Sequence, residues 1–152
     1  MIDYYEIKSQ PITRVMVLQA YKKVRANKGS GGVDNMDWKW LDNNRDSELY
    51  KLWNRLTSGS YFPVPVKEVA IKKKGGGERK LGIPTLLDRI AQQVAKTHLE
   101  RILEPHFHNS SFGYRPARNC HQAVEQANRK TYDHDFVIDM DIKGFFDTID
   151  HD

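Results

Sequence analysis

Two oppositely charged segments carry most of the side chains that could do chemistry. Residues 133–152 contain seven aspartates and one lysine, whereas residues 67–80 contain six lysines and arginines and two glutamates. Carboxylates are ligands that Mg²⁺ prefers, and lysine and arginine attract phosphates. The two segments therefore predict a cation site in one place and a phosphate site in another. Solvated surface charge explains each count equally well.

The acidic segment follows a pattern typical of a β-strand over residues 136–141. Asp139 and Asp141 would lie on one side of this strand, opposite the apolar side chains of Phe136, Ile138 and Met140. A strand that ends in carboxylates can hold a hard cation together with substrate phosphates. The alternative is a polar strand end that faces water. One such strand cannot build a two-metal site by itself.

The basic segment predicts a β-hairpin whose turn is the run of glycines at 75–77. Alternation of side chains places Lys73 and Arg79 in one row with the apolar residues of both strands. When the apolar rows are matched, the pairs become Lys73 with Arg79, Ile71 with Leu81 and Val69 with Ile83. Two cations directly opposite each other repel, so this register indicates that an anion comes between them.

Five helical patterns must position these two segments. They are predicted from Pro11 to Gly29, from Trp38, from a cap near Asp46 or Ser47 to Gly59, from Thr85 to Pro105, and around Ala123–Ala127. Thr85 and Asp88 form a capping box, and the apolar stripe behind them, up to Leu103, is expected to be core. The run 29–32, Gly-Ser-Gly-Gly, is expected to be a flexible loop. Together these elements predict an α+β fold.

Composition excludes several classes of protein. The 152 residues are 39% hydrophobic, enough for a core, and a transmembrane span or a signal peptide is not indicated. Cys120 is the only cysteine, which excludes an intrachain disulfide and favours a reducing, intracellular compartment, with the thiol expected to be buried or inert. We expect a cytoplasmic protein of a bacterium. His106 and His108 lack a third ligand nearby, so we expect surface residues rather than a metal site.

Four segments of the chain resemble a known family. The residues from Val137 to His151, VIDMDIKGFFDTIDH, resemble the first catalytic motif of reverse transcriptases encoded by group II introns. In the same order as in that family, Gly29–Met36 resembles its N-terminal extension, Val69–Gln93 its fingers hairpin and following helix, and Ser111–Arg118 its next block. The resemblance covers residues 12–152.

The resemblance implies a role for particular residues. Asp141 and the main-chain carbonyl of Ile142 would bind catalytic Mg²⁺, and Phe146 would be the steric gate under the incoming sugar, with Phe145 competing for that role or Phe146 simply buried. Lys73 and Arg79 match the pair that grips the nucleotide triphosphate. Further contacts to nucleic acid are implied for Lys72, Lys74, Lys80, Arg115 and Arg118, although solvated lysines and structural salt bridges are equally consistent with these positions.

The resemblance also implies a domain layout and a set of partners. Residues 1–36 would be the N-terminal extension, 37–132 the fingers, and 133–152 the start of the palm, before the second catalytic motif. The partners would be an RNA template, a DNA primer, dNTP and group II intron RNA, with a maturase role in splicing and no membrane. The site would bind two Mg²⁺ ions, and residues outside this chain would complete it. We therefore expect the chain alone to be inactive as a polymerase.

Two alternatives remain open on the sequence. The chain could be an RNA-binding module that recognises intron RNA through the basic hairpin and has no catalytic role. It could also belong to a reverse transcriptase of the retron, diversity-generating or CRISPR-linked type.

Overall fold

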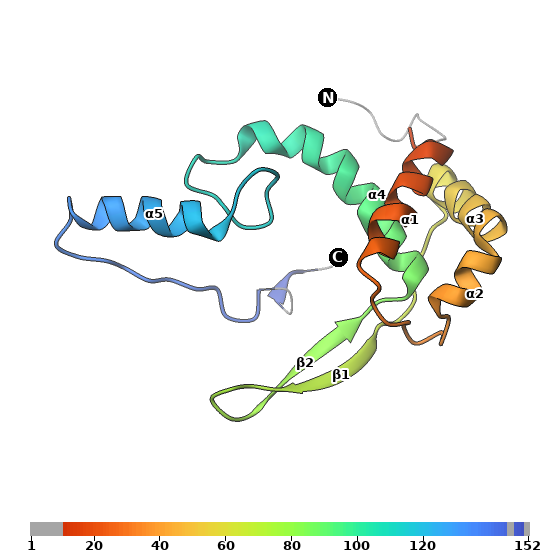
Figure 1. Cartoon of the computed structure of the whole chain (residues 1–152), viewed down its shortest axis with the longest axis horizontal. Helices are drawn as coiled ribbons and strands as arrows, with labels where there is room; N and C mark the ends of the chain where they lie inside the picture. The colour runs from red at the N-terminus through yellow and green to blue at the C-terminus, as the bar shows by residue number, and fades with distance from the viewer. Residues whose placement is uncertain (1–10, 146–147, 151–152) are drawn as a thin grey trace. The chain divides into compact units, whose positions relative to one another are not determined.

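The fold is described from a computed structural model for residues 11–145 and 148–150. Helices and one two-stranded antiparallel sheet make up the regular structure of these residues, which confirms the predicted α+β class. The chain divides into two compact units, the first up to Ile102 and the second from Leu103 (Figure 1). This division falls inside the range 37–132 that the sequence assigned to one fingers subdomain.

The helices of the first unit surround a single apolar core. They are α1 (Arg14–Ala26), α2 (Trp38–Asn43), α3 (Arg45–Ser58) and the first half of α4 (Leu86–Leu103). Burial of aliphatic side chains from all four is the main force that holds them together. The core consists of Val17, Ala20, Tyr21, Leu41, Leu49, Leu52, Leu86, Ile90, Ala91 and Val94.

The ends of α1 and α3 correct two predicted boundaries. Thr13 caps α1 by accepting a hydrogen bond from the Met16 amide at 3.2 Å, so Pro11 precedes the helix rather than starting it. Asn44 precedes α3, not Asp46 or Ser47. Gly59 closes α3 as predicted, because its φ of 72° is a left-handed conformation that glycine adopts without steric cost.

The predicted hairpin is present, with its register shifted. β1 (Lys67–Lys72) pairs antiparallel with β2 (Glu78–Ile83), and Ile71 lies opposite Arg79, not Leu81. The reason is the turn, which already begins at Lys73: its amide donates to the Gly77 carbonyl at 3.0 Å and its carbonyl accepts from Gly76 at 3.2 Å. A shift of two residues keeps every side chain on its predicted side, because side chains alternate with a period of two.

The long helix α4 is core over only half its length. Thr85 caps it through the Asp88 amide at 3.1 Å, and the residues from Leu86 to Val94 that face the other helices are buried. Leu99, Ile102 and Leu103 are about half exposed, so the prediction of a continuous core stripe is wrong for the last turns. The helix ends at Leu103, and Pro105 lies in the following 3₁₀ turn η1 (Glu104–His106).

In the second unit, α5 (Cys120–Thr131) forms at the predicted position. Asn119 and Gln122 form a capping box at its start. The predicted strand over 136–141 is absent: these residues form no ladder with any described strand, and their apolar side chains are exposed. A strand needs a hydrogen-bonded neighbour, which the alternating pattern alone does not supply. Among residues 11–145 and 148–150, none of the helices combines the length and the hydrophobicity that a membrane-spanning helix requires.

Candidate functional site

The two faces of the hairpin differ in charge. One face holds two oppositely charged pairs: Lys80 contacts the Glu68 carboxylate at 3.1 Å, and Lys72 lies opposite Glu78 in the register. The two lysines and two glutamates of this face give it a formal charge of zero, and only Lys80 forms an ion pair among the residues described. The other face carries an apolar row that ends in Arg79; the row consists of Val69, Ile71, Leu81 and Ile83.

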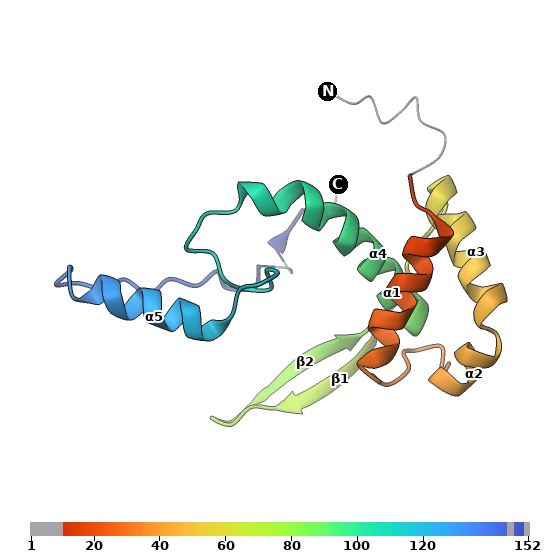
Figure 2. The same cartoon turned by 45° about the horizontal axis from the view of Figure 1, so that its top comes forward.

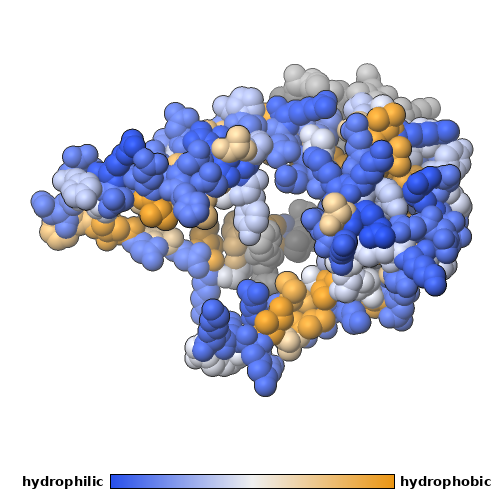
Figure 3. All heavy atoms as spheres, viewed as in Figure 1, coloured by the Kyte–Doolittle hydropathy of each residue, from blue (hydrophilic) through white to orange (hydrophobic). Residues whose placement is uncertain are grey.

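The turn end of the apolar face holds cations that have no carboxylate partner among the residues described. Arg79 lies opposite Ile71, and the hydrogen bond from Lys73 to Gly77 extends the ladder by one pair. Alternation then places Lys73 on the same side as Ile71 and Arg79. Figure 3 shows the result as a hydrophobic surface along the hairpin that gives way to a hydrophilic tip. The expected pair of cations on one side is therefore retained, although they are not directly opposite each other.

The glycine-rich run 29–32 is tied to the base of the hairpin, which corrects the prediction of a flexible loop. Trp38 donates from Nε1 to the Gly29 carbonyl at 2.7 Å, and Arg89 donates from Nη2 to the Ser30 carbonyl at 2.5 Å. A Cβ on Gly32 would lie only 2.7 Å from the Thr85 backbone. Glycine is needed here for close approach. A cavity of about 310 Å³ lies between this loop and the hairpin residues Lys67, Val69 and Ile83.

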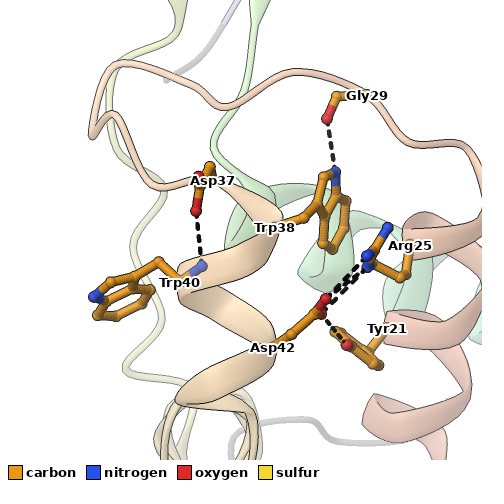
Figure 4. A network of polar contacts seen from close by, with 7 residues as sticks. All are labelled: Tyr21, Arg25, Gly29, Asp37, Trp38, Trp40 and Asp42. Atoms are coloured by element: carbon orange, nitrogen blue, oxygen red, sulfur yellow. Dashed lines mark hydrogen bonds and ion pairs between the residues drawn. The ribbon is translucent and has the colours of Figure 1, made fainter.

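A polar network fixes the helices that carry this loop (Figure 4). The Asp42 carboxylate accepts a hydrogen bond from the Tyr21 hydroxyl and a forked pair from Arg25, whose Nη2 lies 2.9 Å away. The Arg25 guanidinium also lies 5.2 Å from the centre of the Trp38 ring. The hydrogen bond from Arg25 lowers the pKa of Asp42, while burial and the Asp42 contact raise the pKa of Tyr21.

A second network fixes the start of α4, directly after the hairpin. The buried Asp88 carboxylate accepts hydrogen bonds from the Tyr61 hydroxyl and from the Thr85 hydroxyl, the latter at 2.8 Å. One half of the predicted capping box is therefore confirmed, since the Thr85 hydroxyl accepts from the Asp88 amide. In place of the other half, the Asp88 carboxylate accepts from the hydroxyl of Thr85. Burial, and then the hydrogen bond to Asp88, raise the pKa of Tyr61 well above its usual value.

Arg115 forms the structural salt bridge that the sequence left open. Its side chain is 8% exposed, its Nη2 contacts Glu104 at 2.8 Å, and its Nη1 donates to the carbonyls of His108 and Ser111. These contacts close the loop between η1 and α5, and they occupy the donors that a phosphate would need. Arg118 lies 5.5 Å from the Phe112 ring and donates to Asn109 at 3.5 Å, the outer limit of a hydrogen bond.

The predicted metal ligands lie in the second unit. Asp139, Asp141 and Ile142 are exposed and belong to the irregular segment after α5. Within residues 11–145 and 148–150, no three side chains of the metal-binding types come together. Phe146, the predicted steric gate, lies outside the described residues.

Two minor predictions can be checked directly. Cys120 is exposed at the start of α5, so of the two expected states, buried or inert, the buried one is wrong and an inert thiol stays a prediction. His106 and His108 are exposed, as predicted.

The contacts that Arg89 makes with the glycine-rich loop had no signal in the sequence, because they join residues that lie 59 positions apart.

Comparison with known proteins places the chain in a family. Residues 71–152 match the family model described as "Reverse transcriptase (RNA-dependent DNA polymerase)". Group II intron-encoded protein LtrA of Lactococcus lactis subsp. cremoris is 37% identical over 133 residues, which are 87% of this chain and 22% of LtrA. Protein YkfC of Escherichia coli K12 is 38% identical over 125 residues, or 79% of this chain and 33% of YkfC.

A more distant relative extends the match to the whole chain. An uncharacterized 91 kDa protein in the cob intron of Schizosaccharomyces pombe is 33% identical over 156 aligned residues, 100% of this chain and 19% of that protein. The chain thus spans between about a fifth and a third of the length of these relatives. The family match includes the hairpin cations, α4 and the acidic segment. The chain belongs to the reverse transcriptase family, and over most of its length it is similar to the group II intron-encoded protein LtrA.

Proposed function

We propose that this chain supplies the fingers and the first palm segment of an RNA-directed DNA polymerase encoded by a group II intron, with a maturase role in splicing. The observation that carries the proposal is the asymmetry of the hairpin. Lys73 and Arg79 lie on one side of its tip with no carboxylate partner among the described residues, whereas Lys72 and Lys80 face glutamates. Cations left unpaired at the end of an apolar row are suited to a nucleotide triphosphate.

The subdomain layout forms part of the proposal. Residues 1–36 would be the N-terminal extension, 37–132 the fingers and 133–152 the first part of the palm. The partners would be an RNA template, a DNA primer, dNTP and intron RNA. Base pairing with the template would select the nucleotide, so the protein needs to recognise only backbone and shape.

In this function the hairpin would bind and orient the triphosphate. Arg79 offers a planar fork that matches two phosphate oxygens, and Lys73 offers a point charge beside it. Together they would offset the negative charge that develops on the leaving pyrophosphate. Phe146 would pack beneath the sugar and exclude a 2′-hydroxyl.

The acidic segment would contribute to the binding of Mg²⁺. The carboxylate of Asp141 and the main-chain carbonyl of Ile142 are hard oxygen donors, which fit this cation. They are too few to hold it alone, so nucleotide phosphates and further carboxylates outside this chain would complete the site. Bound Mg²⁺ would supply Lewis-acid stabilisation of the phosphoryl transfer.

The lysines and arginines assigned to nucleic acid have unequal support. Lys74 lies in the turn, exposed and without an ion pair among the described residues, and is the best candidate for an RNA backbone contact. We assign Lys72 and Lys80 a smaller part, because each has a glutamate nearby. Arg118 keeps some donors available, whereas the donors of Arg115 are largely used inside the protein.

A chimera tests the proposal. This chain would replace the matching 133-residue segment of LtrA, and extension of a DNA primer on an RNA template would be measured. We expect synthesis by the chimera, its loss in Asp141→Asn, and a raised KM for dNTP in Arg79→Ala. Lys80→Ala is the matched control, since it removes the same charge from the neighbouring position on the other face. Full synthesis by Asp141→Asn would contradict the proposal and leave the RNA-binding module as the better interpretation.

A further inference from the structure

The hairpin projects from the helical body of the first unit and is held at one end only. Figures 1 and 2 both show β1 and β2 leaving that body side by side, with the turn at the far end. Its two stems touch each other near Gly82, where a Cβ would lie 2.8 Å from the Val66 side chain. The orientation of the tip therefore depends on whatever fixes the stems.

Arg89 joins three parts of the chain at this point. From α4, its Nε donates to the carbonyl of Pro84, the residue that follows β2, at 3.1 Å. Its Nη2 donates to the Ser30 carbonyl in the glycine-rich loop at 2.5 Å. Its Nη1 lies over Gly29, where a Cβ would come within 2.6 Å. One guanidinium thus ties the hairpin stem and the loop to the body.

The loop held by Arg89 braces the stem from the other side. Gly32 lies against Pro84 and Thr85, so close that a Cβ would approach their backbone atoms to 3.0 Å and 2.7 Å. The Pro84 segment is therefore enclosed between the loop and α4. If the fork of Arg89 is removed, both the direct bond to the stem and the bond that presses the loop against it are lost.

The length of the hairpin amplifies a small movement at this point. Arg79 lies five residues from Pro84, or about 17 Å along a strand that rises about 3.4 Å per residue. A rotation of about 10° at the stem then moves Arg79 by about 3 Å. That displacement is enough to break a hydrogen bond to a phosphate oxygen, whose donor–acceptor distance is about 2.9 Å.

We propose that Arg89 is a positioning residue that fixes the angle between the β1–β2 hairpin and the helical body, and through that angle the location of Lys73 and Arg79. The consequence for nucleotide binding rests on the function proposed above. The hinge itself does not, because it follows from contacts within the first unit.

Distance measurements between spin labels test the hinge. The labels are introduced with Gly75→Cys at the tip, where added atoms meet no neighbour within 4 Å, and with Lys22→Cys on the exposed side of α1. Cys120→Ser removes the exposed native thiol. Pulsed electron resonance then gives the distance distribution for the 152-residue chain with Arg89 and with its variants.

We expect a narrow distribution with Arg89 and a distribution broadened or shifted by about 3 Å or more in Arg89→Ala. Arg89→Lys should behave in the same way, because an ammonium lacks the rigid fork that spans two carbonyls. If the distances change in Arg89→Ala but not in Arg89→Lys, the hinge is still supported, and a single hydrogen bond from residue 89 is then sufficient to hold it. Arg101→Ala, an exposed arginine on the same helix, is the control and should leave the distances unchanged. Should Arg89→Ala fail to fold, Arg89→Gln decides the question, and unchanged distances in whichever of these two variants folds would overturn the proposal.

A nucleotide readout separates this inference from the proposed function. Binding of fluorescent dATP with Mg²⁺ to the same chain should weaken by about tenfold in Arg89→Ala, the loss of one charge-assisted hydrogen bond. Arg79→Ala should weaken binding while the distance distribution stays narrow. If distances respond to Arg89 but neither variant changes dATP binding, the hinge stands and the nucleotide function of the hairpin fails.

Discussion

The charge asymmetry of the hairpin leads to a quantitative prediction about binding to RNA. Three tip cations, Lys73, Lys74 and Arg79, have no carboxylate partner among the described residues, whereas Lys80 is paired with Glu68 at 3.1 Å. Counterions condensed on the RNA are released when protein cations neutralise its phosphates, and Lys80 should neutralise fewer of them because it is paired with Glu68. Removing Arg79 should therefore change the salt dependence of binding more than removing Lys80.

The expected size follows from the number of unpaired cations. For single-stranded nucleic acid the slope of log affinity against log salt is about −0.7 for each neutralised phosphate. Three contacts give a slope of about −2.1. With this slope, a fourfold rise in salt concentration lowers the affinity about 18-fold. Arg79→Ala leaves two contacts, a slope of about −1.4 and a loss of about sevenfold over the same range.

Filter binding of a short single-stranded RNA, titrated from about 50 to 200 mM KCl, measures these slopes. Lys80→Ala changes the net charge by the same amount as Arg79→Ala and is the matched control. The double variant Glu68→Ala/Lys80→Ala removes the ion pair without changing the net charge, and its slope should equal that of the unmodified chain. Equal slopes for Arg79→Ala and Lys80→Ala would show that binding senses overall charge, and the argument from the two faces would then be refuted.

Three further predictions concern stability. Ile90→Ala should destabilise the first unit by about 2–5 kcal/mol, since Ile90 is fully buried, whereas Ile102→Ala on the same helix, 49% exposed, should cost about 1 kcal/mol or less. Urea unfolding followed by tryptophan fluorescence measures both, and equal losses would mean that the last turns of α4 are packed. Glu104→Gln removes the counter-charge of Arg115, whose side chain is 8% exposed. We expect the second unit to lose about 1–3 kcal/mol of stability, measured by circular dichroism, and no loss would contradict a structural role. The pKa of Asp42 is lower in the folded than in the unfolded state, so the ionised carboxylate stabilises the fold above the unfolded pKa of about 3.9, and this stabilisation is lost as the pH falls through the folded pKa. In an acid titration, the stability of Asp42→Asn should therefore fall less steeply than that of the unmodified chain. Parallel curves of stability against pH would exclude Asp42 as the source of the acid sensitivity.

The sequence alone was sufficient for features that depend on local chemistry. Alternation predicted the hairpin and the side on which Lys73 and Arg79 lie, because the strand period of two survives a shift of the register by two residues. The Thr85 cap and the stop at Gly59 were also readable, since each depends on a few neighbouring residues. The resemblance to reverse transcriptases, carried by four short motifs, agreed with the family match.

Features that depend on partners distant in the chain could be decided only by the tertiary structure. The alternating pattern at 136–141 predicted a strand, but a strand requires a neighbouring strand to accept and donate hydrogen bonds, and these residues form no such ladder within the described part of the chain. The role of Arg115 was undecided until Glu104 and two loop carbonyls were placed around its guanidinium. The run at 29–32 read as flexible because glycine permits both freedom and close packing. Only the approach of Arg89 and Thr85, more than fifty residues away, shows that close packing is its purpose.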